Sequence, residues 1–219
     1  MLSLNLNKIN DQGIKILCLG AHCDDIEIGC GGTLLKILEK HNRAEVHWVV
    51  FSSDIQREVE ARKSAGMFMR NAGSATVSIE KFRNGYFPCH GEDIKDYFEI
   101  MKEKISPDII FTHYRLDLHQ DHKKISELTW NTFRNHLIFE YEIPKYDGDF
   151  GIPNCFVPLE LSMCHQKIKY INDFFKTQSD KHWFKDDLLF SVLRIRGMEC
   201  VSPTNYAEAF FCRKMVVEY

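Results

Sequence analysis

Two short polar clusters hold most of the residues in this sequence that could carry out chemistry. The first spans residues 21–33 and reads AHCDDIEIGCGGT, so that His22 is followed closely by Asp24 and Asp25. The second spans residues 113–122 and reads HYRLDLHQDH, with three histidines and two aspartates. Imidazole and carboxylate groups suit Zn²⁺, and also Fe²⁺ and similar divalent ions. The clusters therefore predict a metal site, which in a catalytic protein keeps an open position for water.

The order of residues within the clusters allows a division of labour. Successive side chains point in different directions, so one of Asp24 and Asp25 can bind a metal while the other takes a proton from water. His119 and His122 are three residues apart and can share one face of a helical turn. Either aspartate of the second cluster can orient one of these histidines. The spacing alone does not separate the roles of the two adjacent aspartates.

Simpler interpretations compete with a metal site. An aspartate in a loop commonly caps a helix, and each cluster taken alone favours that interpretation. The glycines at 29–32 follow a predicted strand, as in a dinucleotide-binding loop, but the pattern is not GxGxxG. Two carboxylates just before the glycines would also repel a phosphate. Two such clusters, each placed directly after a strand, favour a functional site.

The clusters are positioned by alternating strands and helices. Short apolar runs predict buried strands at 14–19 and 108–112, a strand at 45–51 and a weaker strand at 75–79. Helical patterns alternate with these runs at 33–41, 54–71, 93–105 and 121–135, and residues 21–32 are expected to form a loop. This alternation predicts a single-domain α/β fold, with a mostly parallel sheet and helices on both faces.

The remainder of the chain has a looser pattern. It predicts strands at 137–143, 155–161 and 209–217, a helix at 164–177 and a loop at 144–153. We therefore expect one domain over residues 1–219, with a core at about 14–137 and a more irregular, substrate-shaping part at about 138–219. Ligands of open α/β sheets bind at the carboxyl ends of strands. If the first and fourth strands are neighbours, the two polar clusters face each other across one crevice.

Composition excludes several classes of protein. The chain has 219 residues, a net charge of −3 and 44% hydrophobic residues, so a basic nucleic-acid-binding face is not expected. No apolar run approaches the roughly 20 residues of a membrane span. The eight cysteines form no CxxC pair, and the polar residues 1–11 show no secretory signal, so reduced thiols and a cytoplasmic location are expected.

The stretch AHCDDIEIGCGGTL, with LDLHQDH further on, resembles the signature of the LmbE-like, or PIG-L, deacetylase family: AHPDD, a glycine cluster and a later HxDH. Similarity to the family's RxxEA at 57–61 and YAEAF at 206–210 extends the resemblance over roughly residues 14–217. It implies a Rossmann-like fold and a metal-dependent hydrolase, commonly with zinc, that removes N-acetyl groups from glucosamine-type sugars. Cys23 stands where the family usually has proline, and a small buried filler is its expected role.

The resemblance also implies roles for individual residues. Three positions match the family's metal ligands: His22, Asp25 and His122. Asp24 matches the general base, which takes a proton from water and passes it to the leaving amine. His119 matches the group that stabilises the oxyanion, Asp121 would hold His119 in orientation, and Arg57 would contact the sugar.

The sequence thus predicts a zinc-dependent N-deacetylase, a hydrolase acting on linear amide C–N bonds, with Fe²⁺ or another divalent metal as an alternative cofactor. Its expected partner is a small N-acetylglucosamine-type amino sugar or a conjugate of one, with no nucleic acid and no membrane span. A homo-oligomer is compatible with the sequence. Two alternatives stay open: a non-catalytic module that binds metal or sugar nucleotide, and a hydrolase of a different acyl amide or ester.

Overall fold

A seven-stranded sheet forms the centre of the molecule. The computed structural model describes residues 13–217. Residues 1–12 and 218–219 lie outside the described residues, and so does the polar start, in which no secretory signal was expected. The strands are β1 (Lys15–Gly20), β2 (Glu45–Val50), β3 (Ser74–Ile79), β4 (Ile109–His113), β5 (Leu137–Tyr141), β6 (Cys155–Leu159) and β7 (Tyr206–Cys212). Their order is β3-β2-β1-β4-β5-β7-β6. Strands β1 to β5 are parallel, and β7 runs antiparallel to both β5 and β6.

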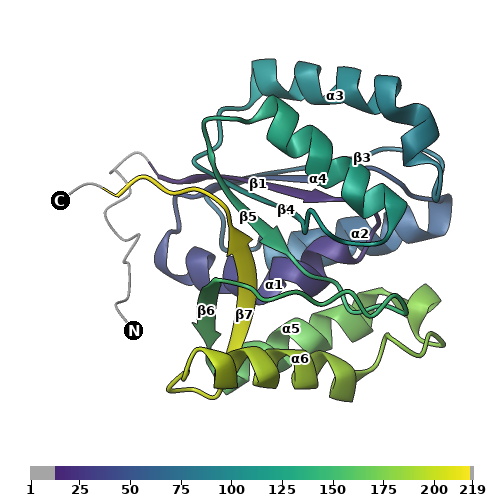
Figure 1. Ribbon diagram of the computed structural model, residues 1–219. Helices are drawn as coiled ribbons and strands as arrows, with labels where there is room; N and C mark the ends of the chain where they lie inside the picture. The colour runs from purple at the N-terminus through teal and green to yellow at the C-terminus, as the bar shows by residue number, and fades with distance from the viewer. Residues whose placement is uncertain (1–12, 218–219) are drawn as a thin grey trace.

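Within residues 13–217, six α-helices cover the two faces of this sheet (Figure 1). They are α1 (Asp25–Lys40), α2 (Ile55–Phe68), α3 (Gly91–Lys104), α4 (Gln120–Thr132), α5 (Leu161–Phe174) and α6 (Asp186–Glu199). Helices α3 and α4 lie on one face, and α1, α2, α5 and α6 lie on the other. The predicted α/β fold, with a mostly parallel sheet between helices, is confirmed. Within the described part of the chain, no helix is long and apolar enough to cross a bilayer.

The two helical layers explain why the central strands are apolar without interruption. In β1, Ile16 and Cys18 belong to the core under α1 and α2, whereas Leu17 and Leu19 belong to the core under α3 and α4. Both faces of the strand are therefore buried, as is usual for a parallel sheet. All eight cysteines lie in the described residues and are free. Burial raises the pKa of the Cys23 thiol to about 12, which agrees with a small buried filler.

The largest difference from the predicted elements is the start of α1. The helix begins at Asp25, and the glycine cluster that was expected in a loop lies inside it. A Cβ atom on Gly29 would overlap the Tyr141 ring, and one on Gly32 would overlap the side chain of Leu159. These glycines therefore allow close packing of α1 against β5 and β6, and they do not form a turn.

The remaining differences are smaller and lie mostly in the second half of the chain. Helix α6 was not predicted, because its apolar residues are spread around the helix and Ile195 is exposed. Strand β7 begins at Tyr206, three residues before its predicted start, and α5 begins at Leu161, also three residues early. Two 3₁₀ helices, Phe87–His90 and Lys176–Gln178, were not expected either.

Candidate metal and catalytic site

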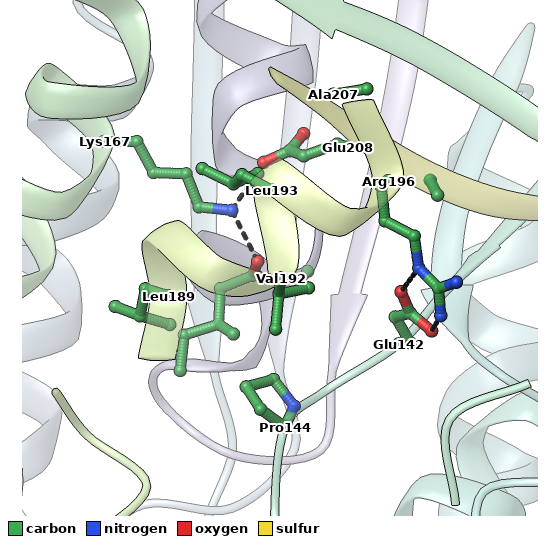
Figure 2. A pocket seen from close by; sticks show the side chains of 12 residues that line it. Glu142, Pro144, Lys167, Leu189, Val192, Leu193, Arg196, Ala207 and Glu208 are labelled. Atoms are coloured by element: carbon green, nitrogen blue, oxygen red, sulfur yellow. Dashed lines mark hydrogen bonds and ion pairs between the residues drawn. The ribbon is translucent and has the colours of Figure 1, made fainter. Parts of the chain in front are cut away.

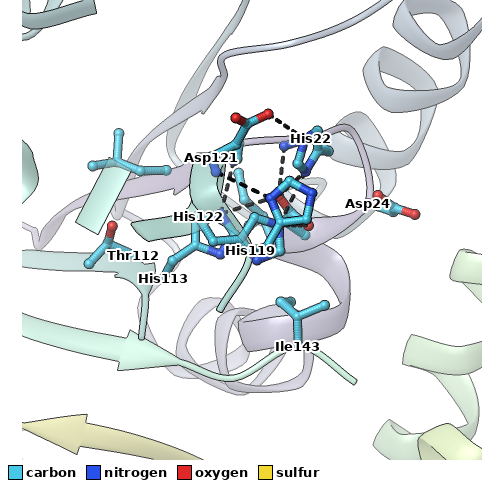
Figure 3. Close-up of polar contacts among 12 residues, drawn as sticks. His22, Asp24, Thr112, His113, His119, Asp121, His122 and Ile143 are labelled. Atoms are coloured by element: carbon cyan, nitrogen blue, oxygen red, sulfur yellow. Dashed lines mark hydrogen bonds and ion pairs between the residues drawn. The ribbon is translucent and has the colours of Figure 1, made fainter. Parts of the chain in front are cut away.

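The two polar clusters meet at the carboxyl ends of β1 and β4. These strands are parallel neighbours, with Cys18 in register with Phe111. From β1 the chain passes into α1 on one face of the sheet, and from β4 it passes into α4 on the other face. This is a topological switch point, where open α/β sheets bind ligands. His22 and His122 are 100 residues apart in sequence, yet their rings are in contact here (Figure 3).

Three potential ligand atoms converge at the centre of the site. Nδ1 of His22 lies 3.1 Å from Nε2 of His122. Oδ2 of Asp25 is 3.4 Å from Nδ1 of His22, and Oδ1 of Asp25 is 3.5 Å from Nε2 of His122. Zn²⁺ bonds of about 2.0–2.1 Å in a tetrahedral arrangement place ligand atoms about 3.3 Å apart. The spacing of the two nitrogens therefore fits a metal ion of this size, with one oxygen of Asp25 facing each of them.

The outer contacts of the two imidazoles determine which nitrogens carry protons. Nε2 of His22 faces two acceptors, Oδ1 of Asn84 at 3.1 Å and Oδ2 of Asp121 at 3.3 Å. Nδ1 of His122 faces Oδ2 of Asp117 at 3.0 Å. In neutral imidazoles these outer nitrogens are therefore the donors. The inner nitrogens, Nδ1 of His22 and Nε2 of His122, then keep their lone pairs. Two lone pairs and a carboxylate face one another, an arrangement that a bound cation stabilises.

The electrostatics of the site also favour positive charge. Burial lowers the pKa of His22, but the Asp25 charge and the hydrogen bond to Asp121 outweigh burial and raise it to about 10. Burial raises the pKa of Asp25, but His122, His113 and His22 hold it well below its usual range. Burial, followed by the neighbouring His113, lowers the pKa of His122 to about 3, which keeps this ring neutral. An ionised carboxylate and a neutral imidazole are the forms that bind metals, so a metal ion bound here would displace the extra proton of His22.

Two other histidines lie close enough to compete as ligands. Among the described residues, two sets place three donor atoms, one from each residue, within 4.8 Å of one another: Asp25, His113 and His122, and His22, His119 and His122. Asp25 is different because it faces His22 and His122 through different oxygens. Nε2 of His113 accepts the Ala21 N–H at 2.9 Å, so its lone pair is already used. Nδ1 of His119 accepts the Asp121 N–H at 3.2 Å, which leaves the proton of a neutral ring on Nε2. His119 is thus arranged as a hydrogen-bond donor.

Asp24 differs from Asp25 in its contacts. It precedes α1, and its Oδ1 accepts a hydrogen bond of 2.9 Å from Nη2 of Arg57, in the first turn of α2. Its Oδ2 is buried without a hydrogen-bond partner among the described residues. Burial raises the pKa of Asp24, Arg57 opposes this effect and Asp25 adds to it. The result is a carboxylate with one anchored oxygen and one free oxygen, which suits a proton acceptor.

The family model described as PIG-L: GlcNAc-PI de-N-acetylase matches residues 17–133, more than half of the chain. The chain belongs to the PIG-L family. The matched segment contains both polar clusters, and the resemblance seen in the sequence is confirmed.

Solved structures of PIG-L-like fold cover nearly the whole chain. N,N'-diacetylchitobiose deacetylase from Pyrococcus horikoshii has a TM-score of 0.70 and 21% identity, over 94% of this chain and 85% of that one. The zinc-inhibited form of a teicoplanin deacetylase has a TM-score of 0.68 and 13% identity, over 90% and 96%. The 4-carboxy-2-hydroxymuconate hydratase of Pseudomonas putida KT2440 has a TM-score of 0.71 and 15% identity, over 94% and 98%. At these identities the likeness concerns the fold.

Some contacts differ from those that the family resemblance implies. The Asp121 carboxylate was expected to hold His119, but it faces His22 and accepts the N–H groups of Gly85 and Phe87 at 2.6 and 3.0 Å. Only the main chain of Asp121 contacts His119, because Asp121 is buried in the first turn of α4 while His119 caps that helix. The guanidinium of Arg57 contacts Asp24, and its expected contact with the sugar stays a prediction.

One functional neighbour was missed from the sequence. Asn84 is a single polar residue in an irregular segment after β3, and no spacing in the sequence relates it to either PIG-L motif. It lies near His22 only because Oδ2 of Asp121 accepts the N–H of Gly85 and so holds this segment against α4. The contact depends on tertiary packing.

Glu208, in the segment that resembles the family's YAEAF, lies away from the histidine cluster. Its carboxylate accepts hydrogen bonds from the N–H groups of Gly32 and Thr33. It also forms an ion pair of 2.6 Å with Nζ of Lys167 (Figure 2). A second buried pair in the same pocket joins Arg196 to Glu142, with two contacts of 2.7 Å. The carboxylate of Glu208 ties β7 to the middle of α1, so we assign this pocket a structural role.

Proposed function

We propose that this chain is a metal-dependent amidohydrolase that removes an N-acetyl group from an amino sugar or its conjugate, with Zn²⁺ as the preferred ion. The observation that carries the proposal is the convergence of lone pairs from His22, Asp25 and His122, with Asp24 beside them. Two imidazoles and one carboxylate leave an open position on a tetrahedral ion, as catalytic zinc sites require. The family's description as a de-N-acetylase of N-acetylglucosaminyl lipid supports the substrate class.

The side chains divide the reaction between them. His22, Asp25 and His122 would hold the metal ion, which would supply polarisation of the acetyl carbonyl and a lowered pKa of water. Asp24 takes the proton of the attacking water on its free Oδ2 and later delivers it to the leaving amine. His119 donates its Nε2–H to the oxyanion that develops on the carbonyl oxygen. Asp121 and Asp117 hold His22 and His122 with their inner nitrogens free.

The test combines metal content with turnover. We expect the purified protein to contain one zinc or iron ion per chain and to release acetate from a panel of N-acetylglucosamine derivatives. A chelator should stop the release, and added zinc should restore it. Metal without acetate release from any derivative would contradict the deacetylase assignment, and a panel of other acyl amides and esters would then identify the bond. No metal after reconstitution would contradict the metal site itself.

Arg57→Met is expected to move the acid limb of the pH profile of kcat/KM to higher pH. Asp24 must be ionised to accept a proton, and Arg57 is the neighbour that lowers its pKa most, ahead of His22. Without the guanidinium, the pKa of Asp24 rises further, so the active form appears only at higher pH. Arg57→Lys keeps the positive charge and should shift the limb less. An unchanged acid limb in Arg57→Met would show that this contact does not tune the base.

A further inference from the structure

The loop that follows β5 is joined to the second polar cluster by one lysine. Nζ of Lys145 lies 3.0 Å from Oδ2 of Asp117 and 2.6 Å from Oδ1 of Asp149. Its third donor position faces the carbonyl oxygen of Ile143 at 3.4 Å. All three ammonium protons therefore have partners, and the side chain is only 11% exposed.

Asp117 relays this contact to the centre of the site. Its Oδ2, the oxygen that faces Lys145, also accepts the Nδ1–H of His122 at 3.0 Å. Its Oδ1 accepts the main-chain N–H of His119 at 2.8 Å. One nearly inaccessible carboxylate thus holds the ring of a proposed metal ligand and the backbone of the proposed oxyanion donor.

A carboxylate in this position needs a cationic partner. Burying an ionised carboxylate is costly unless the carboxylate is paired with a cation. Lys145 provides that cation, with its Nζ 3.0 Å from Oδ2 of Asp117. Paired and ionised, Asp117 accepts the His122 proton, fixes the plane of the ring and makes its Nε2 a stronger donor to metal. Without the ammonium, the carboxylate would be free to turn, and His122 would lose its fixed orientation.

We propose that Lys145 is a positioning residue for the metal ligand His122, acting through Asp117. The inference rests on the proposed metal-dependent function. It extends the metal site from the second polar cluster into the loop after β5, which carries no motif of its own, so the loop and the ligand are coupled.

Asp149 makes it possible to test whether Lys145 orients Asp117 or only anchors the loop. Oδ2 of Asp149 accepts the main-chain N–H of Leu118 at 2.6 Å, while its Oδ1 binds Lys145. Asp149→Ala removes this loop anchor but leaves Lys145 in contact with Asp117. Lys145→Met removes both contacts while keeping the length of the side chain. The two variants therefore differ in whether Asp117 retains its cation.

The experiment measures zinc affinity of the full-length apoprotein by competition with a chromogenic chelator at pH 7. We expect Lys145→Met to weaken zinc binding by about 10–100-fold, the usual cost of losing an outer partner of a ligand. Lys145→Arg should restore most of the affinity, and Asp149→Ala should stay closer to the wild type than Lys145→Met. Lys124→Met is the matched control, because Lys124 pairs with Glu127 on α4 away from Asp117.

Each outcome decides the proposal. Equal zinc affinity of Lys145→Met and the wild type, with both folded by circular dichroism, would overturn it, and so would equal losses in Lys145→Met and Asp149→Ala. If Lys145→Met does not fold, Lys145→Gln in the same assay replaces it with the same expectation. A wild-type protein that binds no zinc would instead contradict the proposed function, which distinguishes the two failures.

Discussion

Asp24→Asn is expected to lower kcat by about 10²–10⁴ while zinc content stays at the wild-type level. The asparagine amide has the shape of the carboxylate, and its oxygen can still accept the hydrogen bond from Arg57. It cannot take a proton from water at neutral pH, so the attacking nucleophile is not generated. Because Asp24 is not among the atoms that converge on the proposed metal position, its loss should not release the ion.

The neighbouring aspartate provides the matched control. Asp25→Asn alters the same type of residue one position later, but it removes the charged member of the proposed ligand set. We expect this variant to lose zinc affinity as well as acetate release. The measurements are metal content by elemental analysis and acetate release under saturating substrate. Wild-type turnover in well-purified Asp24→Asn would exclude Asp24 as the base, and loss of zinc from that variant would assign it to the ligands.

The fold was predictable because its signals are local. Each buried strand of the parallel sheet is a short apolar run, and β1 and β4 are each followed directly by a polar cluster. The meeting of the two clusters required one further condition, that β1 and β4 be neighbours, and the strand order meets it. Histidines and aspartates at the carboxyl end of a predicted β-strand, or directly after it, therefore indicate the position of the site before any tertiary contact is known.

The features that were not predicted depend on contacts between distant segments. Glycines at 29–32 favour a loop by their own propensity, but the Tyr141 ring requires a helix without Cβ atoms at that point. The side-chain partner of Asp121 is His22 because α4 packs beside the end of β1. Lys145 reaches Asp117 across 28 residues, from a loop whose composition indicates only a turn.

His119→Ala is expected to lower kcat by about 10²–10³ with little change in zinc affinity, as for the loss of one oxyanion donor. Burial lowers the pKa of His119, and the neighbouring His22 lowers it further, so the ring is neutral at pH 7. Because the Asp121 N–H occupies Nδ1, the single proton lies on Nε2 and is available to the developing oxyanion. Alanine removes this donor but none of the three converging ligand atoms.

His119→Gln tests the nature of the contact, since its side-chain amide can donate a hydrogen bond but cannot titrate. We expect it to recover part of the lost kcat, with KM close to the wild-type value in both variants. Zinc affinity tests whether His119 is itself a ligand, because His119 belongs to one of the two sets of donor atoms that lie within 4.8 Å of one another. If His119→Ala bound zinc markedly more weakly, His119 would be a ligand, and the oxyanion would need another donor. Unchanged zinc affinity with reduced kcat would identify His119 as the group that stabilises the transition state.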